Sequence, residues 1–284
     1  MDVSERKEAE EERQANLWFF ESMDNVNRAI QGTNDLEQMV SDVLESVPLI
    51  FHCDRAWLVY PCDPEAASWR AVMEHTRPEW PGAFALGLDL PVDQSVARVF
   101  QAGRASSGPV QFGPGSEYPV PGQLVERFGV QSLIAVAVYP KVGEPYMFGL
   151  HQCAYPRGWT PREERLFQEI GRRLADALTT LLMFRNLRES EARLEEAGRI
   201  AHVGYWDRNL DTDRLTWSNE TYRIFGLPPQ ESPITFARYQ ELIHAEDREK
   251  MFRAVMEALR GGTRWNTAWS DPTARCASST VLAM

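Results

Sequence analysis

The segment VQSLIAVAVYPKVGEPYMFGLHQC, residues 130–153, decides the fold of the chain. Its two apolar runs, residues 130–139 and 145–152, contain the β-branched and aromatic side chains that favour strands. The short KVGE connection between them, residues 141–144, is typical of a tight turn between antiparallel strands. We therefore predict a buried hairpin around which the rest of a domain is built.

The sequence before this hairpin predicts further strands and helices. Apolar residues in 4–46 recur at three- and four-residue steps and are interrupted near residues 32–34, which predicts two helices. The remaining elements are expected as strands over 56–60 and 69–73, a loop with room for a short strand over 79–90, helices over 92–102 and 122–128, and a loop over 106–121. This mixture predicts an α+β fold.

A long helix is predicted after the hairpin. Thr160, Pro161 and Glu163 supply a helix cap, a first-turn proline and the second half of a capping box. The helix should continue past residue 190 as a charged amphipathic segment. Dimerisation is expected through residues 165–197, with four leucines near the seam: Leu174, Leu181, Leu187 and Leu194. The alternative is that this helix packs back on its own domain.

Composition limits the classes of function. The chain has 30 basic and 41 acidic residues, a formal net charge of −11, which disfavours nucleic acid and anionic membrane surfaces as partners. The acidic start of the chain is no signal peptide, and the longest apolar stretch, residues 133–138, is too short to span a bilayer. We expect a cytoplasmic protein. The four cysteines form no CxxC pair, so no metal site is predicted.

The motifs CDRAWLVYP, ERFGVQSLIAVAVYP and FGLHQCAYPRGWTPREERLF, together with the order of elements, resemble a GAF domain of bacterial sensor kinases over residues 25–186. The resemblance implies an antiparallel sheet with helices and a pocket for a small ligand. Relatives in this family bind cyclic nucleotides, haem or bilins, or only dimerise.

Three cofactor classes follow from that resemblance. A bilin is not expected, because residues 121–123 carry no attachment cysteine and Ala154 and Tyr155 replace the phytochrome histidines. The motif of cyclic-nucleotide GAF domains is missing. Haem stays open: His151 and Cys153 alternate on one predicted strand, so both side chains should face the same side of the sheet and are the candidate cofactor-binding residues. His52 and Cys53 are weaker candidates.

A second resemblance covers residues 191–262. The stretch ARLEEAGRIAHVGYWDRNLDTDRLTWSNETYRIFGLPP and the later HAED are similar to the opening of a PAS domain of the fold-3 subclass. We expect an N-terminal helix over 1–24, a GAF domain over 25–186, a helical linker over 187–202 and a partial PAS α/β sensor domain over 203–263. Residues 264–284 match no PAS strand, which predicts a disordered or frame-shifted tail and a chain truncated from a longer sensor.

The sequence therefore predicts a sensory input module without catalysis of its own. It contains no phospho-acceptor helix, ATP lid, GGDEF turn or metal-ligand motif, so no catalytic residue is expected. The first hypothesis is a fragment of a sensor histidine kinase that binds a small ligand and relays a signal through a dimeric helical linker. The alternatives are a free-standing dimeric ligand- or haem-binding protein and, for the intact parent, a diguanylate cyclase sensor.

Overall fold

The computed structural model describes residues 3–209, 214–229, 234–250 and 252–253. The chain divides into two units, Met1–Arg185 and Asn186–Met284, and each is described by itself. The predicted tail over 264–284 lies outside the described residues. The predicted domain limits at residues 24, 186, 202 and 263 stay predictions.

The first unit is an α+β domain. Its elements are α1 Val3–Gln31, α2 Leu36–Phe51, β1 Arg55–Tyr60, β2 Ser68–Thr76, the 3₁₀ turn η1 Phe84–Leu86, β3 Leu90–Pro91, α3 Gln94–Ala105, β4 Val110–Phe112, α4 Gly122–Phe128, β5 Ser132–Val138, β6 Tyr146–Gln152 and the first part of α5 Pro161–Ala201. The predicted hairpin is confirmed as β5 and β6, which pair antiparallel from Ser132 opposite Gln152 to Val138 opposite Tyr146.

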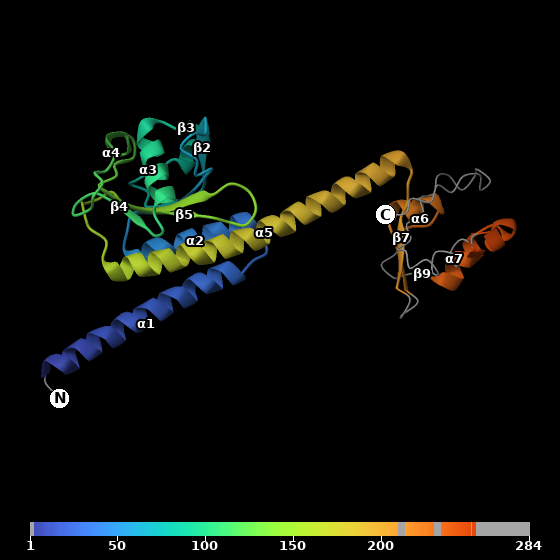
Figure 1. Cartoon of the computed structure of the whole chain (residues 1–284), viewed down its shortest axis with the longest axis horizontal. Helices are drawn as coiled ribbons and strands as arrows, with labels where there is room; N and C mark the ends of the chain where they lie inside the picture. The colour runs from blue at the N-terminus through green and yellow to red at the C-terminus, as the bar shows by residue number, and fades with distance from the viewer. Residues whose placement is uncertain (1–2, 210–213, 230–233, 251, 254–284) are drawn as a thin grey trace. The chain divides into compact units, whose positions relative to one another are not determined.

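Six strands form one antiparallel sheet in the order β3-β2-β1-β6-β5-β4. Helices α2 and α5 lie on one side of this sheet, and α3 and α4 lie on the other (Figure 1). Because both faces are covered, the central strands are apolar on both faces instead of alternating with polar residues. All seven residues of β6 are buried.

Alternate residues of β6 therefore enter two different cores. Phe148 and Leu150 pack in the core made with α1, α2 and α5, where the rings of Phe148 and Phe167 stack with centroids 4.6 Å apart. Met147 packs in the opposite core, among side chains of β1, α3 and β5. The strand is thus a shared wall between the two cores.

The start of α5 confirms the predicted capping box. The backbone N–H of Glu163 donates to Thr160 Oγ1 over 3.3 Å, and the N–H of Thr160 donates to Glu163 Oε2 over 2.8 Å. Pro161 is the first helical residue, where its missing N–H costs no hydrogen bond.

The predicted dimer seam is wrong at Leu174. This side chain is fully buried in the core of the first unit, together with Leu166, Phe167, Ile170 and Leu178 of the same helix, and Leu181 packs against that core. The first half of α5 packs back on its own domain because its apolar stripe faces α2 and the sheet. Leu187 and Leu194, in contrast, are 56% and 63% exposed.

Two local features differ from the predictions. The loop over 106–121 contains strand β4, which pairs with β5 through Val110 opposite Ala135. Helix α2 continues beyond residue 46 to Phe51 and contains Pro48. Proline has no N–H, so the helix lacks one hydrogen bond at this position. The Pro48 carbonyl accepts from Cys53 N–H over 3.2 Å where the helix ends.

The second unit begins with the end of α5 and contains β7 Trp206–Asn209, β8 Arg214–Trp217, α6 Asn219–Ile224, β9 Ile234–Thr235 and α7 Phe236–Leu242. Its strands form a sheet in the order β7-β8-β9. Helix α5 ends where Val203 N–H donates to the Gly198 carbonyl over 2.8 Å and His202 adopts a left-handed conformation, φ +52°. A core follows, in which the rings of Trp206, Trp217 and Tyr239 meet.

A prediction concerns Gly149, which makes room for the Trp57 indole on the neighbouring strand. A Cβ at position 149 would lie 2.1 Å from the Trp57 ring, so Gly149→Ala should lower the free energy of unfolding by about 1–3 kcal/mol. The measurement is chemical unfolding of the purified chain. The matched control is Gly122→Ala, where no atom lies within 4 Å of the added Cβ, and its stability should hardly change. Equal effects of the two variants, or an undiminished effect in a Trp57→Phe background, would contradict this packing.

Candidate functional site

A cavity lies in the first unit on the side of the sheet that α3 and α4 cover. Its volume is about 50 Å³, room for about three to five water-sized groups, and it is partly open to solvent. The walls are mainly aliphatic and aromatic, with three ionisable side chains among them: Arg55, Trp57, Val59, Trp69, Glu74, Ala83, Val96, Val99, Phe100, Leu124, Phe128, Leu133 and His151.

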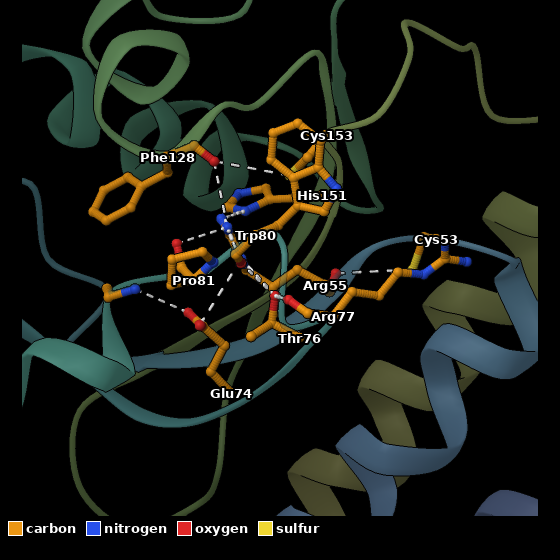
Figure 2. Close-up of polar contacts among 11 residues, drawn as sticks. Cys53, Arg55, Glu74, Thr76, Arg77, Trp80, Pro81, Phe128, His151 and Cys153 are labelled. Carbon is orange, nitrogen blue, oxygen red and sulfur yellow. Dashed lines mark hydrogen bonds and ion pairs between the residues drawn. The ribbon is translucent and has the colours of Figure 1, made fainter.

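Arg55 is the first residue of β1 and is 1% exposed. Its Nη2 donates to three backbone carbonyls, those of Trp80 at 2.7 Å, Pro81 at 3.1 Å and Phe128 at 3.3 Å. These carbonyls belong to the loop after β2 and to the end of α4, as Figure 2 shows. A buried guanidinium thus holds two segments against the sheet.

Glu74 completes this arrangement from β2. Its carboxylate lies 3.9 Å from Arg55 Nε and accepts from Ala83 N–H over 3.1 Å. A Cβ at Gly82 would lie 2.1 Å from that carboxylate, so glycine lets the Glu74 carboxylate stay in this position. Burial raises the pKa of Glu74, and Arg55 and the N–H groups of residues 82–84 act against that rise.

His151 lies beside Arg55 on the cavity side of β6. The Nδ1 atom is 3.0 Å from Arg55 Nη1, and because a guanidinium can only donate, Nδ1 accepts and the ring proton is on Nε2. Burial lowers the pKa of His151 well below its usual value, and the positive charge of Arg55 lowers it further. The ring packs at 5.1 Å from the Trp57 ring. His151 is therefore a neutral hydrogen-bond donor in the cavity wall.

Strand β6 ends at Gln152, as the predicted run over 145–152 does, so Cys153 lies just past the strand on which it was expected to alternate with His151. The strand ends because the buried Asp54 carboxylate accepts from the N–H groups of Cys153 and Ala154. The Cys153 thiol is 3.8 Å from the Phe128 carbonyl, and burial raises its pKa to about 11. Burial likewise raises the pKa of Cys53 to about 12, so both groups are thiols and not thiolates.

The donor set of this site does not fit haem iron. An axial histidine needs a free nitrogen lone pair, whereas Nδ1 of His151 is occupied by Arg55 and Nε2 carries the proton. A cysteine ligand must be a thiolate, and burial, which raises the pKa of the Cys153 thiol to about 11, opposes that form. Within the described residues, no three His, Cys, Asp or Glu side chains are grouped so as to hold a metal ion. A cofactor role for His151 and Cys153 stays a prediction.

Two indole N–H groups in the cavity wall lack a partner. Trp57 and Trp69 are each 7% exposed, and neither Nε1 atom has an acceptor among the residues that the structure describes. A buried donor without an acceptor costs about 1–3 kcal/mol. The indole N–H groups of Trp159, Trp206 and Trp217 are also unpaired there, but these side chains line other regions.

Sequence reasoning missed Arg55 and Glu74. Arg55 stands in the quoted motif CDRAWLVYP, where a charged residue directly precedes an apolar strand. That position suggests a charge at the sheet surface, whereas hydrogen bonds to distant segments hold the side chain in the interior. An arginine at the start of a strand whose other residues are apolar was the available signal.

The first unit is thus an α+β domain with an antiparallel sheet, helices on both faces and a cavity under one helical layer. Comparison with known families agrees with this fold. The GAF domain family matches residues 35–178, more than half of the 284 residues, and the PAS fold matches residues 214–269. The chain belongs to the GAF domain family and carries a PAS fold after it. Both predicted resemblances are confirmed.

The curated relatives are sensor kinases. A blue-light-activated histidine kinase of Brucella anthropi is 32% identical over 73 residues, 26% of this chain and 15% of that protein. The protein of the same name in Brucella ovis is 31% identical over 72 residues, 25% of this chain and 14% of that protein. The matched segment thus spans about a seventh of these relatives. The two domains and these relatives identify a sensory signalling module.

Two solved structures illustrate a similar chain path. The phycoerythrobilin-bound GAF domain from a cyanobacterial phytochrome is 16% identical, with 60% of this chain and 99% of that chain covered and a TM-score of 0.48. The chromophore-binding domain of Stigmatella aurantiaca phytochrome P1 is 15% identical, with 55% and 58% covered and a TM-score of 0.44. Among the described helices, none is long and apolar enough to cross a membrane.

A second prediction concerns the role of Arg55 as the residue that holds the two segments. Arg55→Lys should lower the free energy of unfolding by about 3 kcal/mol, because one ammonium cannot reach three carbonyls and His151 together. Thermal or denaturant unfolding measures the loss. The matched control is Arg70→Lys at an exposed position of β2, for which a change below about 0.5 kcal/mol is expected. A similarly small effect of Arg55→Lys would refute the role.

A third prediction concerns pH. Because the pKa of His151 is depressed in the fold, the unfolded chain binds this proton more readily below about pH 6.5. Its contribution to stability is present above that pH and is lost as the pH falls, by up to about 1.4 kcal/mol per pH unit. Glu74 works in the opposite direction: its pKa is raised, so its contribution is present below the ordinary glutamate pKa of 4.5 and is lost as the pH rises through the raised value.

The difference between the wild type and His151→Gln isolates the histidine, since glutamine keeps an acceptor for Arg55. Denaturant unfolding between pH 5 and pH 8 should show a steeper loss on acidification for the wild type. His75→Gln, at an exposed position of β2, is the control and should retain the wild-type slope. Parallel curves for the wild type and His151→Gln would show that His151 is not held neutral.

Proposed function

We propose that this chain is a sensory input module that binds a small molecule in the GAF cavity and passes the occupancy signal to helix α5. The observation that carries this proposal is the partly open cavity of about 50 Å³, whose wall includes Arg55, Glu74 and His151. In the proposal the module works in the cytoplasm and performs no reaction itself. The output belongs to a longer histidine kinase, in line with the relatives that the chain matches in part.

The proposed relay follows the shared wall between the two cores. His151 faces the cavity, and its neighbour Leu150 on β6 faces the core that contains the first half of α5. Phe148 stacks on Phe167 of α5. A ligand that shifts β6 by a small distance would therefore press directly on α5, because packed cores transmit displacements.

Two alternatives remain distinct from this proposal. A free-standing dimeric protein that binds a small ligand would use the same cavity but would have no output domain. A haem-binding protein would show a Soret band on addition of haemin, and His151→Ala and Cys153→Ala would each perturb it. The protonation states of His151 and Cys153 favour a ligand-binding protein without haem over a haem-binding protein. For the parent protein, the histidine kinase relatives favour a kinase over a diguanylate cyclase.

A fourth prediction tests whether the cavity takes a ligand. Ala83 lines the cavity and is 9% exposed, so Ala83→Leu should fill part of it. In a thermal-shift screen of small metabolites, compounds that raise the melting temperature of the wild type should lose this effect in Ala83→Leu. Ala105→Leu, on the exposed end of α3 and outside this cavity, is the control and should respond like the wild type. The proposal fails if no compound stabilises the wild type, or if Ala83→Leu responds equally.

A fifth prediction concerns dimerisation through the second half of α5. Met183, Leu187 and Leu194 are about half exposed or more and follow four- and seven-residue steps, the spacing of a two-stranded seam. Leu187→Glu with Leu194→Glu should convert a dimer into a monomer, as measured by sedimentation velocity. Asn186→Glu with Ala192→Glu adds the same charge beside the seam and should leave the dimer in place. A monomeric wild type would contradict the proposed relay by a dimeric linker.

A further inference from the structure

The charged side chains in the wall of the GAF cavity are engaged with the protein itself. Arg55 donates through Nη2 to three backbone carbonyls, through Nη1 to His151 and through Nε to Thr76 Oγ1, the last over 3.4 Å. The Glu74 side chain is 4% exposed, accepts from Ala83 N–H and lies 3.9 Å from Arg55 Nε. Each charge therefore has its partner inside the domain, and neither is left for an ionic ligand.

The surface that these partners leave to a ligand is apolar. Almost all of the lining of the cavity belongs to carbon atoms, because the polar atoms of the wall point into the protein. The ring of His151 is uncharged, since its pKa is held well below the usual value by burial and by Arg55. An ion that entered would lose its hydration shell without gaining an opposite charge. The aliphatic side chains of this wall are Val59, Ala83, Val96, Val99, Leu124 and Leu133.

The volume of the cavity limits the size of the ligand. At about 10–15 Å³ for each water-sized group, 50 Å³ has room for about three to five such groups. A polar cavity of this size would hold ordered water, whereas an apolar cavity stays dry and takes up small apolar molecules. The cavity is partly open, so a small molecule can enter without unfolding of the domain.

We infer that the cavity binds an uncharged, apolar molecule of about three to five non-hydrogen atoms, of the class of short branched hydrocarbons. This inference rests on the proposed function, since it names the ligand class of the same cavity. The ligand contacts Val99 of α3, Leu124 of α4 and Leu133 of β5, and thus touches both the helical layer and the sheet. Its binding removes apolar surface from water and adds dispersion contacts to a wall that lacks them.

Three probes test this ligand class in NMR titrations of the full chain with labelled valine and leucine methyl groups. The first, 2-methylpropene, has the planar shape and the atom count of acetate but no charge, and para-xylene is apolar but larger. The methyl signals of Val96 and Val99 report on the cavity. The dissociation constant of 2-methylpropene should be at least about tenfold lower than that of acetate or para-xylene. No binding of 2-methylpropene, or equal or tighter binding of either other probe, would overturn the inference.

A variant of the wall tests the size limit. Leu124→Ala removes apolar volume from the cavity wall, so it should tighten para-xylene binding at the Val96 and Val99 signals by about tenfold or more. If Leu124→Ala does not fold, Val99→Ala is used with the Val96 signal. The matched control is Leu178→Ala, the same deletion in the opposite core, for which these signals should respond to each probe as in the wild type.

Failure of this inference and failure of the proposed function give different results. Unchanged para-xylene binding in a folded Leu124→Ala variant would overturn the inference. A charged or larger metabolite that stabilises the wild type but not Ala83→Leu would also overturn it, while supporting the proposed function. If 2-methylpropene binds the wild type as expected, Ala83→Leu should abolish that binding, because the added side chain fills the same volume.

Discussion

The buried guanidinium of Arg55 is the interaction on which the ligand side of the GAF domain depends. Removing a positive charge from water is costly, and here three backbone carbonyls, His151 and the nearby Glu74 carboxylate compensate for it. The compensating groups come from β2, the loop after it, the end of α4, and β6. One side chain therefore fixes the relative positions of four segments that form the wall of the cavity.

This constraint also determines the chemistry of the site. Because Arg55 donates to Nδ1 of His151, the histidine stays neutral and presents a donor instead of an iron ligand. Because Asp54 holds the chain after β6, Cys153 is buried as a thiol near the Phe128 carbonyl. The two residues that looked like a cofactor pair in the sequence have structural partners that account for their burial.

Local sequence patterns predicted the strands and the helix start whose structure depends on residues close by in the chain. The apolar runs of β5 and β6 and the capping box at Thr160 and Glu163 form as expected, because neighbours along the chain decide them. Strand β4 was missed because its three residues stand in a Gly- and Pro-rich loop and are ordered by pairing with β5. Leu174 was misplaced because helical spacing alone cannot distinguish a stripe that faces its own domain from one that faces a second chain. Arg55 was missed because its hydrogen-bond partners, from Thr76 to His151, lie 21 to 96 residues away along the chain.

Hydrogen exchange of the backbone amides, compared between the wild type and Arg55→Lys, tests the central claim most directly. The account predicts that exchange in the loop that contains Gly82 and Ala83 and around Phe128 becomes faster by more than the global loss of stability explains, while the amides of α1 and α2 lose no more protection than that global loss. Unchanged exchange in both segments, or an equal increase throughout the domain, would contradict the claim that Arg55 specifically holds the cavity wall.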